Sequence, residues 1–152
     1  MKLRLTAVAA LVALAFALPT GAIAEDTTVE MLNKREDGAK MVYSEDITRI
    51  EAGDTVTWVP TARGHNVQFI AGPEGWKAPK KSKLGKEYSY TFDTDGVYVY
   101  VCTPHAGMGM LAMVVVGEAS AEAIAAVEDA KVRGKSKKKF AALLEELTTE
   151  QE

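Results

Sequence analysis

Cysteine and histidine are scarce in this sequence. Its 152 residues include one cysteine, Cys102, and two histidines, His65 and His105. A single cysteine excludes an intrachain disulfide. The net charge of −3 at pH 7 gives no excess of positive charge, so nothing in the composition indicates nucleic-acid binding. The length suits one domain with its own core.

Long apolar runs are also lacking. The apolar run at residues 7–18 has 12 residues, whereas a membrane-spanning helix needs about 20. This run follows Lys2 and Arg4 and ends before Ala22-Ile23-Ala24, a pattern that is typical of secretory signal peptides. We therefore expect residues 1–24 to be a signal peptide cleaved after Ala24, in preference to a membrane anchor. No membrane span is expected in the mature chain.

One short segment, residues 102–110 with the sequence CTPHAGMGM, contains three potential metal ligands: Cys102, His105 and Met110. A proline and two glycines within it disfavour a helix, so we expect a tight loop. Such a loop can direct all three donors at one point. A fourth donor must come from another part of the chain, and His65 is the remaining histidine.

A thiolate, two imidazoles and a thioether suit copper better than other common metals, in a trigonal His2Cys plane with a weak axial methionine bond. Zinc takes cysteine, histidine and carboxylates, so the thioether argues against a zinc site. A catalytic Cys–His pair is disfavoured because His105 follows Cys102 closely and no third orienting residue is evident. Each residue taken alone is an ordinary core or structural residue, but their joint spacing favours a metal site.

The motif Cys102-Thr-Pro-His105-x-Gly-Met-Gly-Met110, with Gly-His65-Asn-Val upstream, resembles the type I blue copper proteins, or cupredoxins. Residues 29–34 (VEMLNK), residues 52–56 (AGDTV) and the tail are similar to the pseudoazurin subfamily. The resemblance covers almost all of residues 27–148. It implies a ligand set for one copper ion that consists of His65, Cys102, His105 and Met110.

The resemblance also implies a function. It indicates a periplasmic electron carrier, not an enzyme, whose partners are redox proteins such as copper nitrite reductases and c-type cytochromes. The electrons would pass through an exposed edge of the His105 ring. A second hypothesis is copper delivery or storage, although exchange sites are usually more open and often richer in methionine. A third, an oxidase or reductase domain, is disfavoured because the sequence has no second histidine cluster.

Short β-strands separated by turns are predicted between residues 28 and 116. Val29 and Met31 alternate with their neighbours, and Thr55 to Val59 is rich in β-branched residues. Alternation from Val97 onward predicts that Cys102 ends a strand. Many short strands favour a sandwich or a barrel. The resemblance implies an all-β, Greek-key β-sandwich with the four ligands near one end.

The tail of the chain changes to a helical pattern. Ser120 is a good N-cap for a first helix, which we expect to end near Arg133-Gly134. Ser136 is expected to cap a second helix with an apolar stripe that consists of Phe140, Leu143, Leu144 and Leu147. This stripe predicts packing on the sandwich. We therefore expect residues 25–118 to form the sandwich and residues 119–152 a helical extension of the same domain.

Positive charge is concentrated in one stretch. Between Arg63 and Lys86 there are six basic residues and one acidic residue, a net charge near +5. The mature chain has 16 basic and 21 acidic residues, a net charge near −5. Because the stretch begins beside His65, we expect a lysine-rich rim, including Lys81 and Lys83, that steers an acidic partner toward the metal site. A solubilising loop is the alternative.

Overall fold

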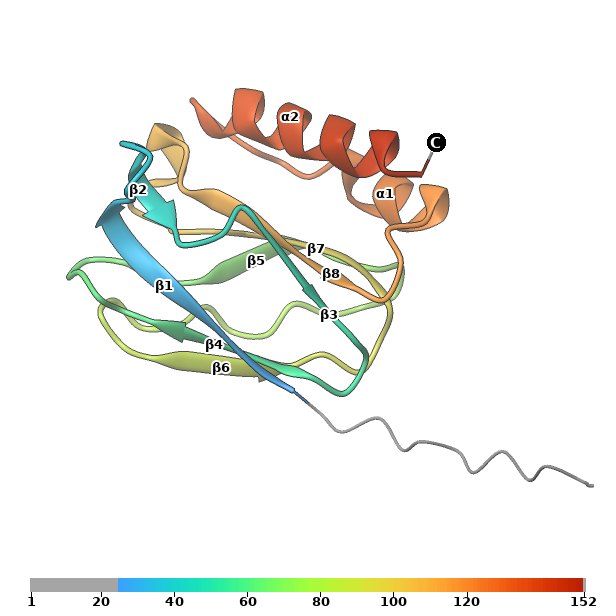
Figure 1. The fold of residues 1–152 in the computed structure, drawn as a ribbon, viewed down its shortest axis with the longest axis horizontal. Helices are drawn as coiled ribbons and strands as arrows, with labels where there is room; N and C mark the ends of the chain where they lie inside the picture. The colour runs from blue at the N-terminus through green and yellow to red at the C-terminus, as the bar shows by residue number, and fades with distance from the viewer. Residues whose placement is uncertain (1–24, 152) are drawn as a thin grey trace, which may run out of the picture.

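The computed structural model describes residues 25–151, and the predicted signal peptide at residues 1–24 lies outside the described residues. The described chain contains β-strands, one short 3-10 helix and two α-helices (Figure 1). The strands are β1 (Asp26–Lys34), β2 (Lys40–Tyr43), β3 (Ile47–Ile50), β4 (Thr55–Val59), β5 (Gln68–Ala71), β6 (Tyr88–Thr91), β7 (Gly96–Val101) and β8 (Leu111–Val116). The helical elements are η1 (Ala106–Met108), α1 (Ala121–Glu128) and α2 (Ser136–Thr149).

The strands form two four-stranded sheets that face each other (Figure 1). One sheet has the order β2-β1-β4-β6, and the other has the order β3-β8-β7-β5. β1 pairs parallel with β4 and β3 pairs parallel with β8, whereas the other neighbours are antiparallel. Parallel neighbours need a crossover connection. The chain therefore passes back and forth between the sheets instead of forming a simple meander.

Alternate side chains of the strands fill the space between the sheets. In β1, Val29 and Met31 are fully buried, whereas the adjacent Glu30 is exposed. This is the period-two pattern that the sequence predicts. The same buried cluster contains Cys102 and Met110. These two candidate metal ligands are therefore part of the core between the sheets.

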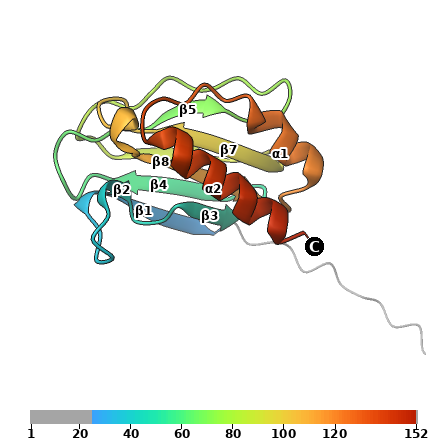
Figure 2. The ribbon, with the colours of Figure 1, turned by 90° about the horizontal axis from the view of Figure 1, so that it is seen from above.

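Both α-helices lie on the outer face of the β3-β8-β7-β5 sheet (Figures 1 and 2). Ile124 and Val127 of α1, and Phe140, Leu143 and Leu147 of α2, are buried in a second cluster with the outward side chains of β7 and β8. Every residue of β7 and β8 is buried, because the two strands are covered on both faces. This double burial explains why the two strands contain no charged residue.

The predicted all-β sandwich with two C-terminal helices packed on it is confirmed. Its sheets and helices follow the predicted order along the chain. Within residues 25–151, no helix combines the length and the hydropathy that a membrane-spanning segment requires.

Two details of the predicted tail are wrong. α1 ends at Glu128 and not near Arg133-Gly134, because the following residues run without helical structure to the Cys102–Met110 loop, where the Lys135 N–H donates to the Gly107 carbonyl. Ser136 does not cap α2 with its side chain. Its hydroxyl donates instead to the Ala106 carbonyl at 2.5 Å, and Lys135 occupies the N-cap position without a side-chain cap bond.

Candidate metal centre

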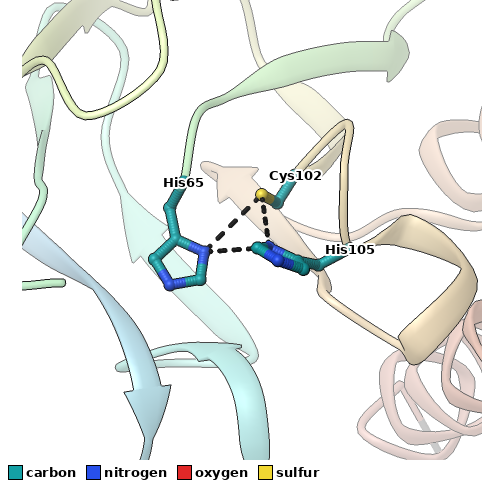
Figure 3. Close-up of side chains that lie close together, drawn as sticks. All are labelled: His65, Cys102 and His105. Carbon is teal, nitrogen blue, oxygen red and sulfur yellow. Dashed lines mark hydrogen bonds between the residues drawn. The ribbon is translucent and has the colours of Figure 1, made fainter. Parts of the chain in front are cut away.

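Two loops at one end of the sandwich bring His65, Cys102 and His105 together (Figure 3). Cys102 directly follows β7, and the chain folds back through η1 to Met110, which precedes β8. Residues 102–110 are called the ligand loop below. The Cys102 N–H donates to the Met110 carbonyl at 3.1 Å, and the His105 N–H donates to the Cys102 carbonyl at 3.0 Å. These backbone hydrogen bonds close the ligand loop on itself.

The three donor atoms form a compact triangle, drawn with dashed lines in Figure 3. The His65 Nδ1 and His105 Nδ1 atoms are 3.1 Å apart, and the Cys102 Sγ atom lies 3.7 Å from the first and 3.3 Å from the second. The point equidistant from the corners of this triangle lies about 2 Å from each atom. Bonds from a transition metal to imidazole nitrogen and thiolate sulfur are about 2.0–2.3 Å long. The triangle therefore has the size of a metal site.

Asn33, at the end of β1, orients the His65 ring. The His65 Nε2 atom lies 2.9 Å from the Asn33 Oδ1 atom. An amide oxygen accepts hydrogen bonds, so Nε2 carries the proton and donates it. The other ring nitrogen, Nδ1, then has a free lone pair directed at Cys102 and His105. This is how a residue outside the ligand set commonly fixes the tautomer of a ligating histidine.

Asn66 ties the two loops together. Its Oδ1 atom accepts from the Thr103 N–H at 2.8 Å and from the Thr103 hydroxyl at 3.1 Å. Its Nδ2 atom donates to the Ser82 carbonyl at 3.2 Å. Because Asn66 follows His65 and Thr103 follows Cys102, these hydrogen bonds set the separation of the two ligand-bearing loops.

The two methionines of the ligand loop differ in exposure. Met110 is fully buried, and its N–H donates to the His105 carbonyl at 3.2 Å. Met108 is 52% exposed. Met110 therefore lies in the core beside Cys102, where a thioether can approach the triangle, whereas Met108 faces solvent.

The surroundings of the triangle favour neutral groups. Burial raises the pKa of the Cys102 thiol, and the backbone N–H groups of Asn66 and His105 oppose this effect only in part. Burial, followed by the effect of the neighbouring His105, lowers the pKa of His65. A neutral imidazole keeps the lone pair that a metal needs. Of these two residues, only Cys102 therefore has to lose a proton when a metal binds.

Exposure separates the two histidines. His65 is fully buried, although a residue in a loop that leads into a strand is expected to be reachable from outside. His105 is half-buried, with the exposed Pro104 and Gly107 beside it. The physical reason is that residues after His65 turn inward: the Tyr43 hydroxyl donates to the Asn66 carbonyl at 2.8 Å. Of the two rings, only that of His105 is accessible from solvent.

The donor set fits copper better than zinc. Among the described residues, no carboxylate joins the group of His65, Cys102 and His105. One thiolate and two imidazoles in one plane, with a buried thioether from the same loop, match the ligands of a type I copper centre. Of the four candidate ligands, His105 is partly exposed and the other three are fully buried.

The comparisons with known proteins agree with this chemistry. Residues 29–117 match the model of the family described as copper-binding proteins, plastocyanin/azurin family. The chain belongs to this family. It is 41% identical to a pseudoazurin of Paracoccus pantotrophus over 140 residues, which cover 91% of this chain and 93% of that protein. It is 40% identical to a pseudoazurin of Methylorubrum extorquens over 120 residues, which cover 78% of this chain and 80% of that protein.

The fold is also similar to that of a solved pseudoazurin structure. A pseudoazurin from Sinorhizobium matches with a TM-score of 0.74 and 40% sequence identity, over 80% of this chain and 95% of that chain. The predicted resemblance to pseudoazurins, the cupredoxin fold and the copper cofactor are therefore confirmed. Plastocyanin/azurin-family proteins are electron carriers, so this chain is a copper electron carrier and not an enzyme.

Sequence reasoning missed one residue that acts on the site directly. Asn33 continues the alternation of Val29 and Met31 in β1, where an apolar side chain is expected, but it is exposed at the end of the strand and reaches His65. A polar residue that interrupts such an alternation was the available signal. Sequence reasoning also missed the contacts between residues 133–136 and the ligand loop, because Gly134 and Ser136 had ordinary interpretations as helix boundaries.

Proposed function

We propose that this chain is a periplasmic electron carrier that binds one copper ion through His65, Cys102, His105 and Met110. The copper ion supplies the redox chemistry, since it alternates between Cu(II) and Cu(I). The observation that carries the proposal is the triangle of three donor atoms about 2 Å from a common point, which opens to solvent only around His105.

The residues around the triangle keep the donors in place. Asn33 fixes the His65 ring, and Asn66 fixes the distance between the two loops. Donors that are held by hydrogen bonds to the protein need to move little when the charge at the site changes. Four protein donors also leave no open position for a substrate, unlike a catalytic metal site. Both properties favour electron transfer over chemistry on a substrate.

Residues 82–85 of the basic stretch are bonded to the chain around His65. Ser82, in its middle, is buried, with its N–H bonded to the Val67 carbonyl and its hydroxyl accepting from the Val67 N–H. The Gly85 N–H donates to the His65 carbonyl at 2.8 Å. These bonds hold the exposed Lys81 and Lys83 next to the His65 loop. This supports the proposal that the rim steers an acidic partner toward the site.

Two large apolar side chains are exposed on these loops. Leu84 is 57% exposed and Met108 is 52% exposed. Leu84 precedes Gly85, which is bonded to the His65 loop, and the Met108 N–H donates to the His105 carbonyl. We infer a small apolar contact area near His105 that is bordered by lysines. A copper nitrite reductase or a c-type cytochrome with an acidic rim around its own redox centre fits such a surface.

The cellular address and the domain division belong to the same proposal. The signal pattern before Glu25 predicts export, and a single thiol in an oxidising compartment needs the protection that burial and metal ligation give. Packing of α1 and α2 on the sheet supports residues 119–152 as an extension of the sandwich domain formed by residues 25–118.

The test is optical and kinetic. The purified mature chain, loaded with one equivalent of copper, is expected to show an intense thiolate-to-copper absorption band that disappears on reduction and returns on oxidation. The reduced protein should pass its electron to a copper nitrite reductase or a c-type cytochrome in stopped-flow mixing. A colourless site that gives up its copper at once to a chelator would contradict the proposal and favour copper delivery.

A further inference from the structure

Residues 133–136, the linker that leads into α2, contact the ligand loop from outside. The Arg133 Nη2 atom donates to the Thr103 carbonyl at 3.2 Å. The Lys135 N–H donates to the Gly107 carbonyl at 3.0 Å, and the Ser136 hydroxyl donates to the Ala106 carbonyl at 2.5 Å. The linker thus satisfies three carbonyl groups of the ligand loop, on both sides of His105.

The linker approaches the loop so closely that a side chain is excluded at Gly134. A Cβ atom built there would lie 2.4 Å from the Gly107 carbonyl oxygen and 2.8 Å from the Gly107 Cα atom. Both are closer than real Cβ contacts, and both involve backbone that cannot swing aside. Gly134 also has a φ of +58°, which favours glycine. The two backbones are therefore in direct contact.

Ser136 forms the buried part of this contact. It is fully buried, although it lies at the exposed start of a helix where three lysines follow. Its hydroxyl is not used for capping α2, as a serine at a helix start usually is. Instead it donates to the Ala106 carbonyl, one residue beyond His105. This use of the serine is explained by the loop and not by the helix.

The linker is itself anchored to the sandwich. α2 buries Phe140, Leu143 and Leu147 against the sheet. The Lys139 Nζ atom donates to the Asp46 carboxylate at 2.7 Å, and Arg35 donates to the same carboxylate at 3.0 Å. These contacts hold α2 on the sheet, so its first residues can support the ligand loop.

We propose that residues 133–136 are a positioning element of the metal centre: through Gly134, Lys135 and Ser136 they hold the Ala106–Gly107 backbone and so fix the position of the His105 ring. The hydrogen bonds within the loop, from Cys102, His105 and Met110, act on its inner side. The linker acts on its outer side. The inference rests on the proposed copper site, because it concerns how that site is held.

The experiment compares Gly134→Ala with Gly75→Ala. Gly75 also has a positive φ, +75°, but a Cβ atom there meets nothing within 4 Å. Its loop lies at the start of β7, where Pro73 approaches Gly96, whereas the site lies at the end of β7. Both variants place a side chain at a positive φ, but only the alanine at position 134 clashes with the ligand loop. We expect Gly134→Ala to change the energy or intensity of the thiolate-to-copper band and to release copper to a chelator about fivefold faster, the factor that one lost hydrogen bond carries.

A second pair keeps the test decisive if Gly134→Ala fails to fold. Ser136→Ala removes the bond to Ala106, whereas Ser120→Ala removes the cap bond of α1 to the Ala123 N–H at the opposite end of the molecule. In the metal-free chain, amide hydrogen exchange at residues 105–110 should speed up in Ser136→Ala and stay unchanged in Ser120→Ala.

The outcomes separate the two proposals. If Gly134→Ala and Ser136→Ala lose stability but match their controls in band position, copper release and loop exchange, the linker proposal is overturned. If the wild-type chain shows no thiolate-to-copper band, the proposal of a copper site is contradicted instead. Faster loop exchange in the metal-free Ser136→Ala chain would still support the contact in that case.

Discussion

The candidate ligands fall into an inner group and an outer group. His65, Cys102 and Met110 are each fully buried and form the inner group. His105 is half-buried and lies beside the 52%-exposed Met108, with the 57%-exposed Leu84 on the loop bonded to His65. The inner residues are surrounded by the core of the sandwich, whereas the outer residues belong to its surface. His105 thus connects the buried ligands to the surface of the molecule.

The difference in burial indicates which property of the site each group controls. Burial and hydrogen bonds fix the geometry of the inner group, so changes there should alter metal affinity, colour and reduction potential. The outer group contributes exposed apolar and charged side chains, so changes there should alter the rate of meeting a partner. Each of the following predictions tests whether this division holds.

Cys102→Ala is expected to have the largest effect. The chain has no other thiol, so the thiolate-to-copper band should disappear completely. The fold should remain, because alanine replaces one small buried side chain by another. Absorption spectra of copper-loaded protein, together with far-UV circular dichroism, measure both results. An intense visible band that survives the substitution would show that copper binds elsewhere.

Asn33→Leu should weaken copper binding by about 10–100-fold, because the His65 ring loses the acceptor that fixes its tautomer. Asn33→Asp keeps an acceptor oxygen at the same place and should retain most of the affinity. Competition with a chelator of known affinity measures the change. Equal affinities for wild type and Asn33→Leu would show that packing alone orients His65.

Met110→Leu and Met108→Leu should differ, although they make the same chemical change in the same loop. Met110→Leu should keep copper but raise the reduction potential, since the axial donor tunes it. Met108→Leu should leave the spectrum and the potential nearly unchanged, because Met108 faces solvent. Spectroelectrochemical titration checks both. A larger shift from Met108→Leu would overturn the assignment of Met110.

Lys81→Glu combined with Lys83→Glu should lower the second-order rate with an acidic partner by up to about tenfold at low salt. The spectrum and the potential should stay the same, because both lysines are exposed and neither contacts the triangle. At 1 M salt, where the Debye length is about 3 Å, the variant and wild type should converge. If the second-order rate in stopped-flow mixing changes neither with salt nor with the substitutions, docking depends on the apolar residues alone.

Asp46→Asn should have the smallest effect, a loss of about 1 kcal/mol in the free energy of unfolding of the metal-free chain at neutral pH. Partial burial raises the pKa of Asp46, but the hydrogen bonds from Arg35 and Lys139 outweigh it and bring the pKa below the ordinary value of 3.8. The unfolded chain therefore takes up this proton first as the pH falls. The stabilisation is complete above pH 3.8 and is lost as the pH falls through the lowered pKa of the folded chain.

Urea unfolding as a function of pH measures this difference. Glu150→Gln is a matched control, because Glu150 pairs with Arg49 across the other end of α2 and both side chains are nearly half exposed. Such an exposed pair should contribute less than about 0.5 kcal/mol. A gap between Asp46→Asn and wild type that persists well below the lowered pKa would show that packing, and not charge, is responsible.

Much of this molecule can be predicted from its sequence because the relevant signals are local. The period-two alternation around Val29 and Met31 predicts β1, and the spacing of Cys102, His105 and Met110 predicts a loop that folds its donors together. Neighbours in the chain decide these features.

The missed features depend on contacts between distant parts of the chain. The burial of His65 follows from bonds that tie the next two residues to Tyr43 and Ser82. The role of Ser136 follows from contact with the ligand loop, 30 residues earlier. Glycine and serine are common at helix ends for local reasons, so the sequence gives no separate signal of a tertiary contact at Gly134 or Ser136.

The most direct test of the copper site is a crystal structure of the copper-loaded chain with anomalous diffraction recorded at the copper absorption edge. We expect a single copper peak inside the triangle of His65 Nδ1, Cys102 Sγ and His105 Nδ1, about 2 Å from each atom, with the Met110 sulfur at a longer distance. A copper peak outside this triangle, or a site in which Met110 is turned away, would contradict the proposed ligand set.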